Sequence, residues 1–299
     1  MANKIAAPFF VPSLPIGTIG DLLTGCASML ESEGIDDAQR EAREIIAAVL
    51  DVPKFWAAAN AVSDASPDVA RAVISAVMKR AAGAPLAYAV GRAAFRHLTL
   101  DVDERVLIPR VETELLVERV LERCTDDTHT LADIGTGSGA IALSLAFEAE
   151  LDKIFATDVS LDALDVASAN AHMLGSALKS PLEFRRGSLL APLAGETLDG
   201  IVCNPPYISF GELQNLPADV RDWEPCLALL SADDGLAMTR ELVRQAPAVL
   251  RRDGFLALEV DARRAGSVAE MIAVDGRYDG IEVLLDLTGR ERFVFASRV

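Results

Sequence analysis

From residue 109 onward, apolar runs of strand length alternate with longer amphipathic stretches of helix length. The first five strands that we predict are residues 130–134, 153–158, 182–186, 198–203 and 254–260. The clearest helices between them are residues 140–150, 161–174 and 236–250. Strands that alternate with helices favour an α/β fold with a parallel, doubly wound sheet. Two further strands, 280–287 and 292–296, lie too close for a helix between them, so we expect them to pair antiparallel.

The first hundred residues follow a different pattern. Residues 1–20 contain three closely spaced prolines and should form an extended lead-in. Apolar positions then recur at helical spacing as far as Gly83, and either Asp64 or Ser66, with Pro67 behind it, can start one of the helices. We therefore expect an N-terminal all-helical domain over residues 1–83, a β-hairpin linker over 84–108 and a doubly wound domain over 109–299. The helical domain fits a packing or dimerising module as well as it fits substrate recognition.

The charge balance limits the partners of this chain. It carries 28 Lys and Arg against 45 Asp and Glu, a formal net charge of −17. A polyanion repels the phosphate backbone, so the composition argues against a general DNA or RNA binder. It fits a small-molecule substrate or a partner protein with a basic face.

The four cysteines are Cys26, Cys124, Cys203 and Cys226. None of them forms a C-x-x-C pair, and no Cys/His cluster has zinc spacing, so we expect free thiols and no metal site. We see no signal peptide and no apolar run long enough for a transmembrane helix. These features together predict a cytoplasmic protein.

A glycine-rich loop follows the first predicted strand of the sheet. The segment Asp133-Ile134-Gly135-Thr136-Gly137-Ser138-Gly139 has G-x-G-x-G spacing, not the G-x-G-x-x-G of dinucleotide folds. Glycines there permit a tight turn and a close approach of backbone N–H groups to a ligand. Three glycines after an acid at a strand end are the pattern of a site for a nucleoside–methionine cofactor. Asp133 could accept hydrogen bonds from an ammonium group or from a loop amide, and the simpler reading of the loop is a structural turn.

An acid also ends the next predicted strand. Asp158 lies 19 residues after Gly139, where it could accept hydrogen bonds from both ribose hydroxyls of a bound nucleoside. The alternative is that Asp158 caps the following helix, a role for which Ser160 competes.

The tetrapeptide Asn204-Pro205-Pro206-Tyr207 ends the fourth predicted strand. Two prolines fix the backbone and remove two donors, which leaves the Asn204 side-chain oxygen and the Pro205 carbonyl as a rigid pair of acceptors. Such a pair can hold both hydrogens of an –NH₂ group, and Tyr207 adds a ring face for a planar group or a sulfonium charge. The arrangement suits methyl transfer to a planar nitrogen through orientation and electrostatics. The alternative is a strand end that the prolines only stiffen.

Together, the glycine loop, Asp158 and Asn204–Tyr207 resemble a class I S-adenosylmethionine-dependent methyltransferase with a Rossmann-like sheet. The run from Val106 to Glu114, which contains Ile108-Pro109-Arg110, narrows the resemblance to the HemK/PrmC family, as do Gly83–Leu86 and Gly91. The similarity extends through Glu224-Pro225 and Asp234-Gly235-Leu236 to the Gly289–Arg292 segment. That family also has an N-terminal helical domain and a hairpin linker. It methylates the side-chain amide nitrogen of the glutamine in the Gly-Gly-Gln motif of peptide chain release factors.

The resemblance implies roles for individual residues. Asp133, Gly135 to Gly139, Asp158, Leu189 and Asn204 would contact S-adenosylmethionine, which leaves as S-adenosylhomocysteine. Asn204, Pro205, Pro206 and Tyr207 would hold the glutamine amide and form the catalytic segment. Arg110 and Glu112 would lie beside the substrate pocket, although their spacing fits a surface salt bridge equally well.

Three positions depart from the family pattern: Val111, Ser188 and Asp261 stand where a proline, an acid and a glycine are usual. These departures leave two alternative functions open. The chain could be a paralogue that methylates another protein or a small molecule, or it could be a non-catalytic module that binds the cofactor. The Asn-Pro-Pro-Tyr motif is shared with nucleic-acid adenine methyltransferases, but the net charge of −17 and the lack of a basic stretch weigh against that function.

Overall fold

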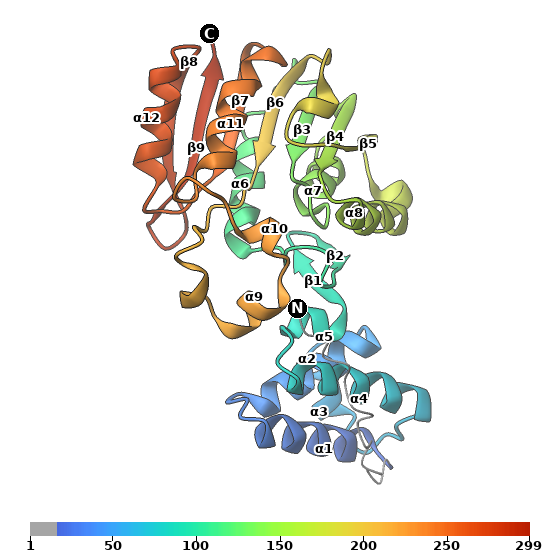
Figure 1. Ribbon diagram of the computed structural model, residues 1–299. Coiled ribbons are helices and arrows are strands. Elements are labelled where there is room, and N and C mark those ends of the chain that lie inside the picture. The colour runs from blue at the N-terminus through green and yellow to red at the C-terminus, as the bar shows by residue number, and fades with distance from the viewer. Residues whose placement is uncertain (1–16) are drawn as a thin grey trace. The chain divides into compact units, whose positions relative to one another are not determined.

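The computed structural model describes residues 17–299, so most of the predicted lead-in lies outside the described residues. The chain divides into two compact units, and the boundary falls between Val90 and Gly91 (Figure 1).

The first unit consists of helices. They are α1 (Ile19–Ser32), α2 (Ala38–Leu50), α3 (Trp56–Ala59), α4 (Pro67–Ala81) and α5 (Leu86–Val90). The predicted start of a helix at Ser66 is confirmed, because the Ser66 hydroxyl accepts a hydrogen bond from Val69 N and Pro67 occupies the first turn. Apolar faces of α1, α2 and α4 bury a common core that includes Leu30, Ile45 and Val77.

The second unit opens with a short antiparallel hairpin of β1 (Arg92–Phe95) and β2 (Leu98–Asp101). The hairpin is shorter than the predicted segment of residues 84–108. Residues 86–90 form α5, which begins directly after Pro85, where the fixed φ of proline suits a helix start. Residues 106–108 form no strand, and Val106 is buried.

A seven-stranded sheet with the order β5-β4-β3-β6-β7-β9-β8 forms the centre of the second unit. The strands are β3 (Thr130–Ile134), β4 (Lys153–Asp158), β5 (Leu182–Arg186), β6 (Leu198–Cys203), β7 (Leu250–Glu259), β8 (Tyr278–Leu285) and β9 (Glu291–Arg298). The first five are parallel, and β9 pairs antiparallel with both β7 and β8. The sequence prediction of a mostly parallel sheet with an antiparallel C-terminal hairpin is therefore confirmed.

The predicted limits of the last three strands differ from the observed ones, most of all at the boundary between α11 and β7. We expected a helix over residues 236–250 and a strand from residue 254, but α11 (Ala237–Gln245) ends five residues earlier and β7 begins at Leu250. Pro247 lacks a backbone N–H and falls in a single 3₁₀ turn (Ala246–Ala248) that closes the helix. The apolar run around this proline buries on the sheet, and it therefore looked like a continuing helical face.

Helices cover both faces of the sheet. On one side lie α6 (Val111–Leu121), α7 (Ala140–Glu148) and part of α8 (Leu161–Leu174), while α11 and α12 (Ala265–Asp275) pack on the other. Successive residues of the central strands alternate between the two cores, as Ile201 and Val202 do. The short helices α9 (Ala218–Trp223) and α10 (Cys226–Leu229) lie in the segment between β6 and α11, together with a 3₁₀ turn at Leu213–Asn215. Two other 3₁₀ turns, Gly175–Ala177 and Ala191–Leu193, lie on either side of β5.

No helix in the described part of the chain is long and apolar enough to cross a membrane.

Candidate active site

The strand order reverses direction beside β3. The chain moves outward from β3 to β4 and β5, and then returns to place β6 on the other side of β3. Ligands of open α/β sheets bind at such a switch point, outside the carboxyl ends of the strands. The glycine loop, Asp158 and Asn204 follow or end β3, β4 and β6, so the fold brings the three predicted motifs to one edge.

Asp133 anchors the glycine loop from inside the sheet. Its Oδ2 accepts hydrogen bonds from the Thr136 hydroxyl at 2.7 Å and from the backbone N–H of Ala142 at 3.1 Å. Its Oδ1 is buried and has no hydrogen-bond partner among the described residues. Burial, opposed by these two hydrogen bonds, raises the pKa of Asp133 from 3.8 to about 7.

The three loop glycines have different reasons to be glycine. Gly135, Gly137 and Gly139 all have positive φ, at 74°, 56° and 85°. A Cβ added at Gly135 or Gly137 would meet no atom within 4 Å, so the loop leaves open space there. A Cβ at Gly139 would lie 2.8 Å from Leu143 Cδ1, so this glycine also permits close packing of the loop on α7.

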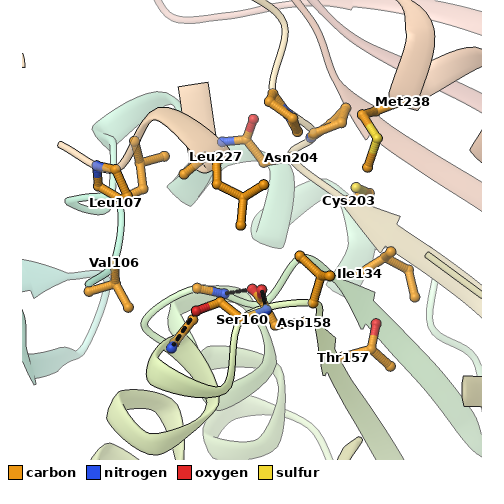
Figure 2. A pocket seen from close by; sticks show the side chains of 18 of the residues that line it. Val106, Leu107, Ile134, Thr157, Asp158, Ser160, Cys203, Asn204, Leu227 and Met238 are labelled. Atoms are coloured by element: carbon orange, nitrogen blue, oxygen red, sulfur yellow. Dashed lines mark hydrogen bonds between the residues drawn. The ribbon is translucent and has the colours of Figure 1, made fainter. Parts of the chain in front are cut away.

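Asp158 holds two backbone segments together. One carboxylate oxygen accepts from Gly137 N at 3.0 Å, and the other accepts from Ser160 N at 2.9 Å. Ser160 is the N-cap of α8, and its hydroxyl accepts from Ala163 N at 3.2 Å. The capping role therefore belongs to Ser160, and Asp158 joins the end of β4 to the glycine loop, as the dashed lines in Figure 2 show.

A cavity of about 170 Å³ lies over these strand ends. Asp158 and Ser160 lie on one side of it, with Asn204 and Leu227 on the other (Figure 2). Other lining residues include Gly135, Gly137, Ser188, Leu189, Pro205 and Met238. We call it the first cavity. Leu189 is a buried leucine with φ 49°, and such left-handed strain in a non-glycine residue is concentrated at ligand sites.

Asn204 lies between the first cavity and a second one. The second cavity measures about 240 Å³ and is lined by Leu107, Arg110, Asn204, Pro205, Tyr207, Ile208, Leu216, Pro217, Val220, Ala228 and Leu229. Asn204 and Pro205 line both cavities, so this backbone segment forms a shared wall. Desolvation raises the pKa of Tyr207 to about 12, which keeps its hydroxyl neutral.

Arg110, which lines the second cavity, is fixed by an ion pair with Glu224. Its Nη2 lies 2.6 Å and 2.7 Å from the two carboxylate oxygens of Glu224, whose side chain is only 1% exposed. This pair connects the start of α6 to the end of α9 and is not a surface salt bridge. Glu112 lies in the first turn of α6 and is not among the residues that line either cavity.

The sequence analysis assigned no role to Thr113, Glu224 or Glu259. Thr113 donates to Glu259 at 2.7 Å and accepts from Asn204 Nδ2 at 3.1 Å. A carboxyl directly after the apolar run of residues 255–258, as at Glu259, was the available signal, because charged residues are rarely buried without a partner.

The departure at Asp261 also has a structural explanation. Asp261 pairs with Arg263 at 2.8 Å, and Arg263 and Arg264 both reach Glu212 in the segment after Tyr207. The acid therefore belongs to an ion-pair cluster that holds that segment against the loop after β7.

Comparisons with known proteins agree with this geometry. Residues 108–216 match the family model described as methyltransferase small domain, and residues 21–91 match the PrmC N-terminal domain. The release factor glutamine methyltransferase of Moorella thermoacetica is 40% identical over 94% of this chain and 99% of its own length. The chain belongs to the release factor glutamine methyltransferase family.

Other release factor glutamine methyltransferases match over similar lengths. That of Cereibacter sphaeroides is 38% identical over 92% of this chain and 97% of its own, and that of Bacillus cereus is 32% identical over 93% and 98%. Among solved structures, the catalytic domain of hMettl16 in complex with MAT2A 3′UTR hairpin 6 shares the fold, with a TM-score of 0.52, 16% identity, and coverage of 78% of this chain and 82% of that one. Members of this family are methyltransferases, so the class I methyltransferase fold predicted from the sequence is confirmed.

Proposed function

We propose that this protein transfers a methyl group from S-adenosylmethionine to the side-chain amide nitrogen of the glutamine in the Gly-Gly-Gln motif of peptide chain release factors. The observation that carries the proposal is the wall shared by the two cavities. Asn204 and Pro205 face a cavity with a glycine loop and an acid on one side, and a cavity with Tyr207 and apolar side chains on the other. A methyl donor in the first cavity and a methyl-accepting amide in the second could thus meet at this segment.

The residues around the first cavity fit the methyl donor. Gly135 and Gly137 leave space beside the backbone, and each oxygen of Asp158 accepts only one protein hydrogen bond and keeps a lone pair for a ribose hydroxyl. Leu189 would pack against the adenine, while Asp133, Thr136, Ser138 and Gly139 would hold the loop in shape. When bound, S-adenosylmethionine supplies a methyl group activated by a sulfonium, and S-adenosylhomocysteine is the product.

The residues at the shared wall fit an amide nitrogen. The Asn204 side-chain oxygen and the Pro205 carbonyl would accept the two N–H bonds of the glutamine amide, and the Tyr207 ring would lie against its planar group. An amide lone pair is delocalised and weakly nucleophilic. Holding both N–H bonds turns that lone pair toward the methyl group and stabilises the positive charge that develops. The nitrogen would form one N–C bond as the methyl–sulfur bond of the donor breaks, and it would then release one of its two protons to water, with no covalent enzyme intermediate.

Arg110 and Glu112 would support the acceptor side indirectly. The Arg110–Glu224 ion pair keeps the wall of the second cavity in place, and Pro206 stiffens the segment that follows Pro205. We further propose that the helical domain of residues 1–83 contributes to recognition of the release factor. The four cysteines form no disulfide, which supports work in the reducing cytoplasm.

The test is methyl transfer from labelled S-adenosylmethionine to purified release factor. We expect the glutamine peptide to gain one methyl group, and we expect the gain to vanish with Asn204→Ala. Asn215→Ala is the matched control, because Asn215 is exposed and lies in neither cavity wall.

Two results would contradict the proposal. Methyl transfer to polynucleotide but not to release factor would make this chain an adenine methyltransferase. Cofactor binding without transfer to any amide or amine would make it a binding module.

A further inference from the structure

Asn204 is the first member of a hydrogen-bonded chain that runs away from the cavities into the protein. Its Nδ2 donates to Thr113 Oγ1 at 3.1 Å, and the Thr113 hydroxyl donates to Glu259 Oε2 at 2.7 Å. Thr113 is 4% exposed and Glu259 is 1% exposed. The register of the sheet accounts for the meeting, because Cys203 pairs with Leu258 and the residues that follow them, Asn204 and Glu259, end neighbouring strands.

The direction of each hydrogen bond in this chain follows from the charge on Glu259. An ionised carboxylate only accepts, so the single hydroxyl proton of Thr113 must point toward it. Thr113 can then only accept from Asn204, and the Asn204 group that it contacts must be the –NH₂. This argument fixes the orientation of the amide by chemistry, since side-chain O and N atoms are hard to tell apart by position alone.

That orientation decides what Asn204 offers to an acceptor. With its –NH₂ held by Thr113, its Oδ1 accepts no hydrogen bond from the described residues and remains available at the shared wall. The opposite orientation would present –NH₂ to the –NH₂ of a glutamine, which is a donor facing a donor.

We propose that Thr113 and Glu259 are positioning residues that keep the Asn204 amide oxygen turned toward the substrate amide. The proposal rests on the proposed function, because it concerns the same transfer. Glu259 would act through Thr113, and neither residue would touch the substrate.

The surroundings of Glu259 make the hydrogen-bonded chain from Asn204 through Thr113 to Glu259 sensitive to protonation of Glu259. Burial raises the pKa of Glu259 from 4.5 to about 7, and the negative charge of Glu112 raises it further, while the Thr113 hydrogen bond and the charges of Arg292 and Arg110 oppose the shift. A protonated Glu259 can donate to Thr113, whose own proton is then free to point at Asn204 and favour the reversed amide. Transfer should therefore weaken as pH falls through the pKa of Glu259.

The experiment compares kcat, KM and cofactor affinity for Thr113→Val, Thr113→Ser and Glu259→Gln with release factor as acceptor. We expect Thr113→Val to lower kcat about 100-fold, as loss of an oriented polar group at a reacting centre does, with cofactor affinity unchanged within about twofold. Thr113→Ser should restore kcat to within about fivefold of wild type, because it keeps the hydroxyl. Glu259→Gln should lower kcat above neutral pH, and it should lack the fall in kcat below pH 7 that we expect of the wild type.

The matched controls are Thr99→Val and Glu291→Gln, two exposed positions that should retain wild-type kinetics. The proposal is overturned if Thr113→Val keeps kcat within about threefold of wild type, or if Thr113→Ser loses as much as Thr113→Val. It is also overturned if kcat of Glu259→Gln falls below pH 7 in the same way as kcat of the wild type.

A second readout separates this proposal from the proposed function. Failure of the wild-type protein to methylate release factor would reject the function but not the hydrogen-bonded chain. The side-chain amide signals of Asn204, assigned by their loss in Asn204→Ala, should then shift with a midpoint near pH 7 in the wild type. The shift should be absent in Glu259→Gln, and an unchanged titration in that variant would reject the chain.

Discussion

Asp133 shows how a site residue can carry a cost for stability. Its buried carboxyl has a pKa raised from 3.8 to about 7, so the folded protein retains a proton that the unfolded chain releases. Between these two values the unfolded state binds fewer protons, and the free energy of unfolding therefore falls as pH rises. Above pH 7 the dependence on this group should level off.

We expect Asp133→Asn to remove that part of the pH dependence. The free energy of unfolding of the variant should rise relative to wild type between pH 5 and pH 8, by at most about 4 kcal/mol for a shift of this size. Urea unfolding at several pH values, without cofactor, measures the difference. Glu259 contributes a slope of the same sign that the variant keeps, and the exposed control Asp126→Asn should follow wild type. A constant difference between Asp133→Asn and wild type at every pH would refute this explanation.

Residues of this kind also mark the limit of prediction from the sequence. Asp133, Asp158 and Asn204 could be found because each ends a strand beside glycine or proline, and strand ends of a parallel sheet meet at one edge. The apolar run before Glu259 hinted at a buried carboxyl, but the roles of Thr113, Glu224 and Glu259 could not be assigned, because those roles depend on contacts between segments as far as 146 residues apart. No local pattern records such a contact.

At the scale of elements, the position of the Asn204–Tyr207 segment after β6 depends on Gly235, a glycine in the loop before α11. Gly235 has φ 86°, and a Cβ added there would lie 2.2 Å from the carbonyl oxygen of Tyr207 and 3.0 Å from its carbonyl carbon. Both neighbouring atoms belong to the backbone, so a side chain at this position must displace the Asn204–Tyr207 segment.

We therefore expect Gly235→Ala to lower kcat at least about tenfold, because displacement of a positioning segment by a fraction of an ångström is costly for orientation. Gly211→Ala is the matched control within the same β6–α11 segment, since its added Cβ would come no closer than 4.0 Å to Ser209 Oγ. Steady-state kinetics with release factor provide the comparison. Equal activity of the two variants would show that the Tyr207 carbonyl can move without consequence.

A single asparagine joins three elements of the second unit. The Asn170 side chain of α8 accepts from Asp101 N at 2.8 Å and donates to the carbonyls of Asp101 and Ser138, both at 3.0 Å. It thus ties the hairpin, α8 and the glycine loop together while being fully buried.

Replacing Asn170 with alanine removes a hydrogen-bond partner from the partly buried N–H and carbonyl of Asp101 and from the buried carbonyl of Ser138. We expect Asn170→Ala to lower the free energy of unfolding by about 3 kcal/mol and to weaken cofactor binding, because the loop loses its support. Denaturant unfolding and calorimetry measure the two effects, and the exposed Asn215→Ala should show neither. Loss of stability with unchanged cofactor affinity would show that Asn170 does not support the glycine loop in cofactor binding.

The element boundaries that could be predicted were those where an apolar run ends at a glycine, a proline or a charged residue. The four strands β3 to β6 have their predicted limits, since apolar runs there end at glycine, proline or charge. The limit between α11 and β7 was missed because an apolar run buried on a sheet face has no clear period, and only Pro247 marked the break.

On the scale of the whole molecule, the negative charge is distributed unequally between the two units. Residues 1–90 carry 7 Lys and Arg against 10 Asp and Glu, a net charge of 7 − 10 = −3. Residues 91–299 carry the remaining 21 against 35, a net charge of −14. The unit that holds the site is therefore the strongly acidic one, and it is poorly suited to a nucleic-acid backbone.

The less strongly charged helical unit exposes two large apolar side chains. Phe55 is 72% exposed and Val62 is 89% exposed. If this unit contributes to recognition, Phe55→Ala should raise KM for intact release factor about threefold to tenfold, as loss of an aromatic contact residue does, and leave KM for a short Gly-Gly-Gln peptide unchanged. Val274→Ala, at an 80% exposed position of the other unit, is the control. A parallel rise in both KM values would contradict a role in protein recognition.

Two consecutive prolines, of which Pro205 belongs to the shared wall, have a consequence for selectivity between side chains of nearly equal shape. Pro205 and Pro206 have no N–H, so this stretch of backbone can receive hydrogen bonds but cannot give them. A glutamate in place of the glutamine would present oxygen lone pairs to oxygen lone pairs, with no donor from these prolines to relieve the repulsion. We therefore expect a release factor whose glutamine has deamidated to bind poorly, because the prolines offer its carboxylate no N–H donor. No residue dedicated to excluding it is needed.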